Sequence, residues 1–258
     1  MAEGVQSGLI QASQVARETA VQTAANALRY ASFGDIRLEA KDLERLVQAV
    51  PAAIAAALGS KTYFFVPLAI CENRSNDSTL VAPAYTPELS DRAICHRNVA
   101  LPGTEGVFIS TRLLGDRFAL AFEFYINVGH AFVDAVGVPE AFEQLVWAQA
   151  LADVRGETSQ DAWESRNAAL SPEARLGNID GRPVVDEKAK TAYLEAAFAD
   201  AVAIYLLSLA VDFDYSELRE REYPLLAPQP LAERLKLAAR LFPPNNSYEF
   251  AIRYRRRA

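Results

Sequence analysis

Four polar side chains stand in the almost wholly apolar residues 119–135, and they are the groups of this sequence best spaced to do chemistry. They are Glu123, Asn127, His130 and Asp134. Their steps of four, three and four residues place them on one face of an α-helix. A carboxylate and an imidazole on a shared face could transfer protons or bind a metal ion. Because an apolar helix is normally buried and buried polar groups need partners, the stripe predicts a hydrogen-bond network or the wall of a cleft.

The composition sets bounds on the fold and on the partners. With 258 residues, of which 51% are hydrophobic, the chain can bury the core of one large domain or two small ones. The net charge of −7 and the pI near 5.1 argue against a nucleic-acid partner. Two cysteines, Cys71 and Cys95, are too few for a disulfide framework and indicate a reducing compartment. A metal cluster of these cysteines with His96 is an alternative, but neighbouring strand residues are the simpler interpretation.

The sequence shows no targeting or membrane-spanning segment. Its first residues lack the basic and apolar regions of a signal peptide. No charge-free apolar run reaches the roughly 20 residues that a spanning helix needs. We therefore expect a soluble, cytoplasmic protein with no membrane partner.

Hydrophobic periodicity and turn residues predict the elements that position the polar stripe. Pro51 should kink the second predicted helix or start a new one. A helical N-terminal extension over residues 1–60 and an α+β domain over residues 61–258 are expected. The predicted helices are residues 11–31, 40–58, 119–136, 141–154, 188–210 and 231–241, the predicted strands are 61–70, 93–100 and 106–110, and 155–182 is predicted to be a polar loop.

Several short motifs resemble the gluzincin family of zinc-dependent peptidases. Residues 98–114 contain an Asn-x-x-Leu-Pro-Gly phrase and a strand that ends in Leu-Leu. They are similar to the edge strand above the cleft of those enzymes, some of which carry an Asn-x-x-x-Leu-Pro-Gly phrase. The gluzincin His-Glu-x-x-His motif follows shortly afterwards, and here that window is residues 126–130. Residues 198–201 resemble the end of the motif on the family's second long helix, and residues 230–235 resemble a stretch often found after it. The resemblance covers roughly residues 93–241 and implies a zincin-like fold with a small mixed sheet and two long buried helices.

The departures from the gluzincin pattern remove the chemistry that the resemblance would imply. A catalytic zinc needs three protein ligands, an open position for water, and a carboxylate that accepts the proton of that water. Ile126 and Asn127 stand where the family has its first histidine and its glutamate, and Ala196 stands where the third ligand would lie. His130 alone is retained. We therefore expect no zinc, no other cofactor and no metal-dependent hydrolysis of peptides.

His130 also has a structural interpretation. A lone histidine on an apolar helix is usually a buried and hydrogen-bonded core residue. Asp134, one turn later, and Asp200, on the second apolar helix, are its candidate acceptors. The helices over residues 119–136 and 188–210 should therefore pack side by side, with His130 facing Asp200.

Two enzymatic alternatives stay open. One is a relocated metal site that uses His130, Asp134 and Asp200, with Glu195 as a further ligand. The other is metal-free acid–base chemistry by Glu123 and His130. A third alternative is a purely structural protein, in which the polar stripe is only a buried network.

The sequence as a whole favours an α+β, zincin-like protein with a degenerate active site. Its expected function is non-catalytic, as a pseudo-peptidase that keeps a cleft for a peptide, a protein or a small ligand. The strand over residues 106–110 would pair with an extended partner through its backbone. The basic residues 253–257 are expected to be a solvated tail.

Overall fold

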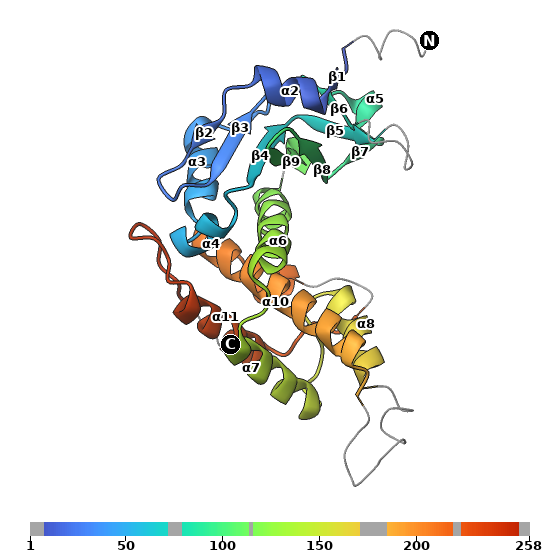
Figure 1. Cartoon of the computed structure of the whole chain (residues 1–258), viewed down its shortest axis with the longest axis vertical. Coiled ribbons are helices and arrows are strands. Elements are labelled where there is room, and N and C mark those ends of the chain that lie inside the picture. The colour runs from blue at the N-terminus through green and yellow to red at the C-terminus, as the bar shows by residue number, and fades with distance from the viewer. Residues whose placement is uncertain (1–7, 72–78, 114–115, 171–184, 219–222, 253–258) are drawn as a thin grey trace, which may run out of the picture. The chain divides into compact units, whose positions relative to one another are not determined.

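The computed structural model describes residues 8–71, 79–113, 116–170, 185–218 and 223–252. Within them the chain is an α+β protein with two compact units (Figure 1). The first unit comprises residues 1–124 and 245–247 and carries two sheets. The second comprises residues 125–244 and 248–258 and is built from helices.

Five strands of the first unit form a mixed sheet in the order β2-β3-β4-β9-β8. In this sheet β4 is parallel to both of its neighbours, and β9 returns antiparallel to β8 after a Pro-Gly turn. Gly103 of that turn has a φ of +75°, in the region that favours glycine, as the Pro-Gly signal predicts. The strand bounds are β2 Gln22–Thr23, β3 Arg29–Ser32, β4 Lys61–Val66, β8 His96–Leu101 and β9 Thr104–Ser110.

Four shorter strands form an antiparallel sheet in the order β1-β6-β5-β7. The predicted strand 61–70 is divided between the two sheets, because Pro67 separates β4 from β5 and has no N–H to donate to a ladder. Ser110 links the sheets, since its Oγ accepts the Ala69 N–H at 2.8 Å and donates to the Ile94 carbonyl at 2.5 Å. The bounds are β1 Ile10–Gln11, β5 Leu68–Cys71, β6 Thr79–Ala82 and β7 Ala93–Ile94.

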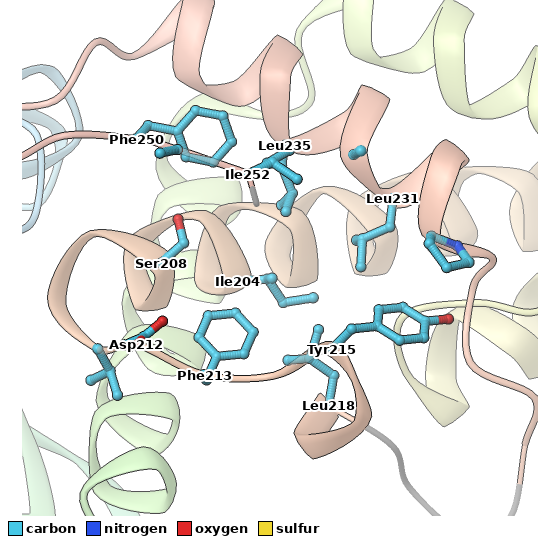
Figure 2. A pocket seen from close by; sticks show the side chains of 14 residues that line it. Ile204, Ser208, Asp212, Phe213, Tyr215, Leu218, Leu231, Leu235, Phe250 and Ile252 are labelled. Carbon is cyan, nitrogen blue, oxygen red and sulfur yellow. The ribbon is translucent and has the colours of Figure 1, made fainter. Parts of the chain in front are cut away.

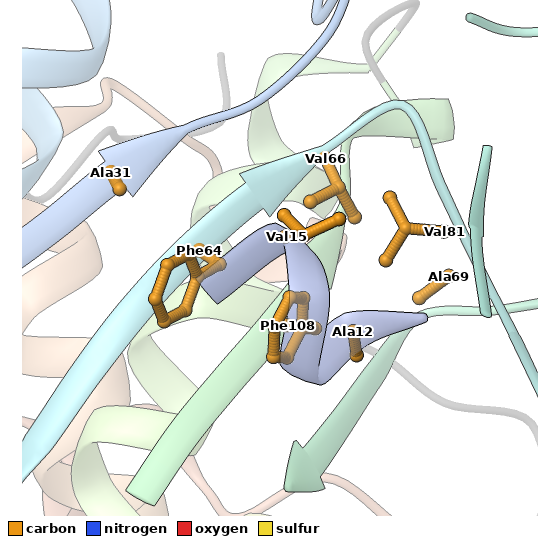
Figure 3. Packing of buried hydrophobic residues seen from close by; sticks show 8 residues of the cluster. All are labelled: Ala12, Val15, Ala31, Phe64, Val66, Ala69, Val81 and Phe108. Carbon is orange, nitrogen blue, oxygen red and sulfur yellow. The ribbon is translucent and has the colours of Figure 1, made fainter. Parts of the chain in front are cut away.

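Strand β4 is buried on both faces and forms the centre of the first unit. On one face Phe64 stacks on Phe108 of β9, with ring centroids 4.7 Å apart. The short helix α2 (Ala12–Glu18) covers that face and contributes Val15 to the cluster (Figure 3). On the other face Tyr63 and Phe65 contact the ring of Phe124. Because successive side chains of β4 point to opposite faces of the sheet, the strand contributes to an apolar layer on each face.

The loop between helices α3 (Ala40–Gln48) and α4 (Ala52–Ala57) is held by two asparagine side chains. The Asn26 amide donates to the Val47 and Val50 carbonyls at 2.8 and 2.7 Å. The Asn245 amide donates to the Gln48 and Val50 carbonyls, and its oxygen accepts the Ala52 N–H. The prediction that a new helix starts at Pro51 is confirmed, since this residue is the N-cap of α4. The remaining short helices of the unit are α5 (Pro87–Ser90) and η1 (Thr111–Leu113).

The prediction of a helix over residues 11–31 is wrong beyond Glu18. The Asn26 side-chain oxygen accepts the Leu28 N–H, and Ala27 has a φ of +71°, so the chain turns here. The buried bonds of Asn26 outweigh the helix propensity of the neighbouring alanines. The described part of the predicted N-terminal extension, residues 8–60, is also not a separate helical unit, because β3 pairs with β4 inside one sheet.

The second unit is arranged around the central helix α10, against which α7, α8 and α11 pack. Helix α6 begins in the first unit and continues through the second. The predicted polar loop contains helix α8, whose cap Ser159 accepts the Ala162 N–H. The rest of that predicted loop, residues 171–182, lies outside the described residues. The bounds are α6 Arg117–Val136, α7 Glu140–Leu151, α8 Gln160–Ala169, α10 Glu187–Ala210, η2 Tyr215–Leu218 and α11 Pro228–Leu241.

Among the helices that the structure describes, α10 alone is long and apolar enough to cross a membrane. Its most apolar window is 78% buried inside the protein, however. This is the burial that a core helix of a soluble protein shows.

Candidate functional site

Helices α6 and α10 cross at Gly129 and Ala199. A Cβ atom on Gly129 would collide with the Ala199 carbonyl oxygen and lie 3.2 Å from its carbonyl carbon, so only glycine permits this approach. The predicted contact of the two helices is confirmed at this crossing. It brings His130 near enough to Asp200 for the imidazole charge to lower the pKa of the carboxyl group.

The polar stripe of α6 does not form a single buried wall. Glu123 is half-buried and Asn127 is buried, whereas His130 and Asp134 are exposed. The prediction that His130 is a buried core residue is therefore wrong. His130 lies about 100° around the helix from Gly129, which is the residue that faces α10. Ile126 and Ala196, the two positions that lack metal ligands, are half-buried.

The imidazole that pairs with Glu123 belongs to His96 rather than His130. The His96 Nδ1 lies 2.5 Å from the Glu123 Oε1, and the His96 side chain is 45% exposed. The spacing of polar residues within 119–135 could not predict this pair, because His96 lies on β8, outside the helix. Cys95 points elsewhere, since its Sγ accepts a hydrogen bond from the Arg112 Nη2 at 3.3 Å.

The described residues contain no group of three histidine, cysteine or acidic side chains that could share a metal ion. Asp200, one of the ligands considered for a relocated metal, instead accepts a hydrogen bond from the Thr158 Oγ1 at 2.8 Å. Asp134 and Glu195 are both exposed. The four residues of the relocated-metal alternative are therefore not assembled into a site.

The strand expected to receive an extended partner is not at an edge. β9 pairs with β4 along one side and with β8 along the other, so its backbone groups are already used. The prediction for residues 106–110 is wrong for this reason. The outer strand of the sheet on that side is β8.

A buried polar network, absent from the sequence predictions, connects the helices of the second unit at Glu157. The Glu157 and Arg234 side chains have no exposed surface, and the Arg234 Nη1 lies 2.9 Å from the Glu157 Oε2. The Arg166 Nη1 and the Tyr193 hydroxyl donate to the Glu157 Oε1 at 3.2 and 2.7 Å. Arg234 also donates from its Nε to the Gln149 Oε1 at 2.8 Å. Residues of α8, α10 and α11 thus meet at one carboxylate, and α7 joins them through the bond between Gln149 and Arg234.

The backbone around Glu157 explains how a carboxylate reaches this position. Its N–H donates to the Pro224 carbonyl, and its own carbonyl accepts the Leu226 N–H. Gly156 has a φ of +82°, and a Cβ atom there would collide with the Leu225 carbonyl oxygen. Burial acts to lower the pKa of Arg234, but the charges of Glu157 and Tyr193 and the hydrogen bonds to them together outweigh it and raise the pKa.

A pocket of about 200 Å³ lies beside the C-terminal end of α10 (Figure 2). α10 contributes Ile204 and Ser208 to its wall, and α11 contributes Leu231 and Leu235 one turn apart. Phe213 and Asp212 come from the segment after α10. Residues 250–252 and η2 complete the lining. The wall is therefore largely apolar, and the sequence motifs gave no indication of it.

A comparison of the sequence with protein-family models finds no match, and a comparison with curated proteins also finds none.

We predict that Glu157→Gln destabilises the protein by about 3–5 kcal/mol, because Arg234 would stay buried without a counter-charge. The exposed Glu164→Gln on α8 is the control and should change the free energy of unfolding by less than about 0.5 kcal/mol. Urea unfolding measures both variants. A loss below about 1 kcal/mol for Glu157→Gln would contradict the role given to this carboxylate.

Asp200 should make stability depend on pH. Burial raises its pKa from 3.8 to about 6, although hydrogen bonds from Ser159 and Thr158 and the charges of His130 and Arg234 act to lower it. The folded state therefore binds this proton more tightly than the unfolded state does. Protonated Asp200 contributes roughly 3 kcal/mol to the free energy of unfolding. This contribution is fully present below pH 3.8 and is lost as the pH rises through about 6.

We predict that Asp200→Asn removes this dependence. Relative to the wild type, the free energy of unfolding of the variant should rise by roughly 3 kcal/mol between pH 4 and pH 7. The exposed Asp134→Asn serves as the control and should follow the wild type across the same range. Parallel curves for Asp200→Asn and wild type in urea unfolding would exclude a raised pKa at Asp200.

Proposed function

We propose that the protein is a non-catalytic binding protein that takes a small, largely apolar molecule into the pocket beside α10. The observation that supports this most is a cavity of about 200 Å³ with apolar walls in the second unit. This volume is somewhat larger than the roughly 150 Å³ of a cavity known to hold benzene. It is smaller than the roughly 300 Å³ at which pockets for drug-sized ligands begin. A ligand with one ring or one short branched chain fits these limits.

The chemistry of the pocket wall favours binding over catalysis. Of the described residues that line it, Asp212 and Tyr215 are the ones that titrate. The Tyr215 hydroxyl donates its hydrogen to the Leu226 carbonyl. The wall therefore offers no pairing of a nucleophile with a base, which covalent catalysis requires. The small number of cysteines and the burial of α10 support a cytoplasmic location for this binding protein.

We predict saturable binding of 2-phenylethanol, a neutral probe of suitable size, with a Kd on the order of 1 mM. Ala232→Leu should abolish this binding, because Ala232 lines the pocket and the larger side chain fills it. Lys236→Leu, at an exposed position of the same helix, is the control and should leave the Kd unchanged. Ligand-observed NMR measures binding, and circular dichroism confirms that each variant folds. Equal binding by Ala232→Leu and wild type would place the probe elsewhere and refute the proposal.

The proposal extends to the origin of the helix pair: α6 and α10 would correspond to the two long helices of a gluzincin whose metal site has degenerated. The crossing at Gly129 and Ala199 supports this, because Ile126 and His130 lie one turn apart on α6 and Ala196 precedes the crossing on α10. A pseudo-peptidase of this kind would be zincin-like in fold without binding zinc.

We predict that Ile126→His, Asn127→Glu and Ala196→Glu together create stoichiometric zinc binding, since the two new ligands at 126 and 196 complete a set of three with His130 and Asn127→Glu restores the carboxylate. The variant without Ala196→Glu should bind zinc far more weakly, because it offers two protein ligands instead of three. Metal analysis after dialysis measures both. A triple variant that retains no zinc would reject the gluzincin origin, while the binding function of the pocket would be unaffected.

A further inference from the structure

We infer that the ligand of the pocket beside α10 is a small amine, a cationic ammonium group attached to a compact apolar body. This inference rests on the proposed function and adds the chemical class of the ligand. It follows from the polar atoms at one end of the pocket, the position of that end on α10, and the aromatic residues of the wall.

The side chains at the polar end of the pocket can accept hydrogen bonds but not donate them. The Ser208 hydroxyl donates its single hydrogen to the Tyr205 carbonyl at 2.6 Å, so only its oxygen lone pairs remain. The Asp212 carboxylate is exposed and accepts only. Figure 2 shows these two side chains at the same side of the pocket. A ligand group that meets both must therefore be a donor.

The Tyr215 hydroxyl offers no donor to the pocket either. It donates to the Leu226 carbonyl at 2.5 Å, and Figure 2 shows it pointing away from Ser208 and Asp212. A carboxylate or phosphate ligand would thus find no side-chain donor among the pocket residues discussed above and would face Asp212. This arrangement excludes anions by charge repulsion as well as by missing partners.

The position of the polar end on α10 adds to the preference for a cation. Ser208 lies in the last turn of this 24-residue helix, and Asp212 follows its C-cap. The C-terminal end of a helix carries a partial negative charge from its unpaired carbonyl groups. The net charge of the whole chain, −7, acts in the same direction. A protonated amine is the small donor that satisfies all of these conditions.

The apolar part of the ligand is limited by the rest of the wall. Ile204, Leu231 and Leu235 supply aliphatic surface, and Phe213 and Phe250 supply aromatic rings. Aromatic faces attract a nearby cation as well as packing on an apolar ring. With about 200 Å³ available, a single ring on a short chain is the largest body that fits.

Three probes of one shape test the inference: 2-phenylethylamine, 2-phenylethanol and 3-phenylpropionate, titrated into the full chain at pH 7 and low salt. The amine should bind roughly tenfold more tightly than the alcohol, and the carboxylate should bind more weakly than both. Asp212→Asn should reduce amine binding to the level of the alcohol and leave alcohol binding unchanged. Asp134→Asn removes the same charge at an exposed position outside the pocket and should change amine binding less than twofold.

The outcomes separate this inference from the function on which it rests. Alcohol or carboxylate binding as tight as amine binding, with all of it lost in Ala232→Leu, would overturn the amine class and keep the pocket as a binding site. Amine binding that Asp212→Asn does not weaken would also overturn it. Failure of all three probes to bind would refute the binding function itself.

Discussion

A buried carboxylate between two guanidinium groups is the constraint on which the second unit depends. Glu157 meets Arg234, Arg166 and Tyr193 where three helices converge, and none of these groups could stay buried if its partners were absent. Such a network requires accurate positions of its members, because a partly satisfied network costs more than an apolar core would. The helices around α10 are therefore held in one arrangement by polar geometry as well as by packing. Of these helices, α10 and α11 also contribute Ile204, Ser208, Leu231 and Leu235 to the wall of the pocket.

At the crossing of α6 and α10, one glycine determines which neighbouring residues are buried and which are exposed. At Gly129 the two backbones approach closely, so the adjacent position His130 is turned toward solvent rather than into the core. Asp200, one residue after the contact on α10, is buried instead and bonds to Thr158. The two helices thus meet as their apolar sequences suggest, but the polar residues of the stripe separate into different environments.

The sequence predicts the long elements well, because their patterns are local. Helices α6 and α10 are long apolar segments, and β4 is a run of aromatic and β-branched residues, so their positions follow from periodicity and propensity alone. Helix α8 could not be predicted because its composition is polar, and the short strand β3 could not be predicted because the alanines beside it favour a helix. The Glu157 network could not be predicted, because its partners lie 9, 36 and 77 residues away in the chain. The pocket could not be predicted for the same reason, since its wall is formed by segments that are distant in the sequence.

The return of the chain to the first unit at residues 245–247 bears on the order of events during synthesis. The loop between α3 and α4 forms three hydrogen bonds with the side chain of Asn245, which is separated from Ala52 by 193 positions. A ribosome must therefore translate residues 125–244 of the helical unit before this loop acquires its last partner. Until then the amide and carbonyl groups of residues 48–52 that bind Asn245 must be satisfied by water. The first unit thus emerges first from the ribosome but acquires its last residues only near the end of synthesis.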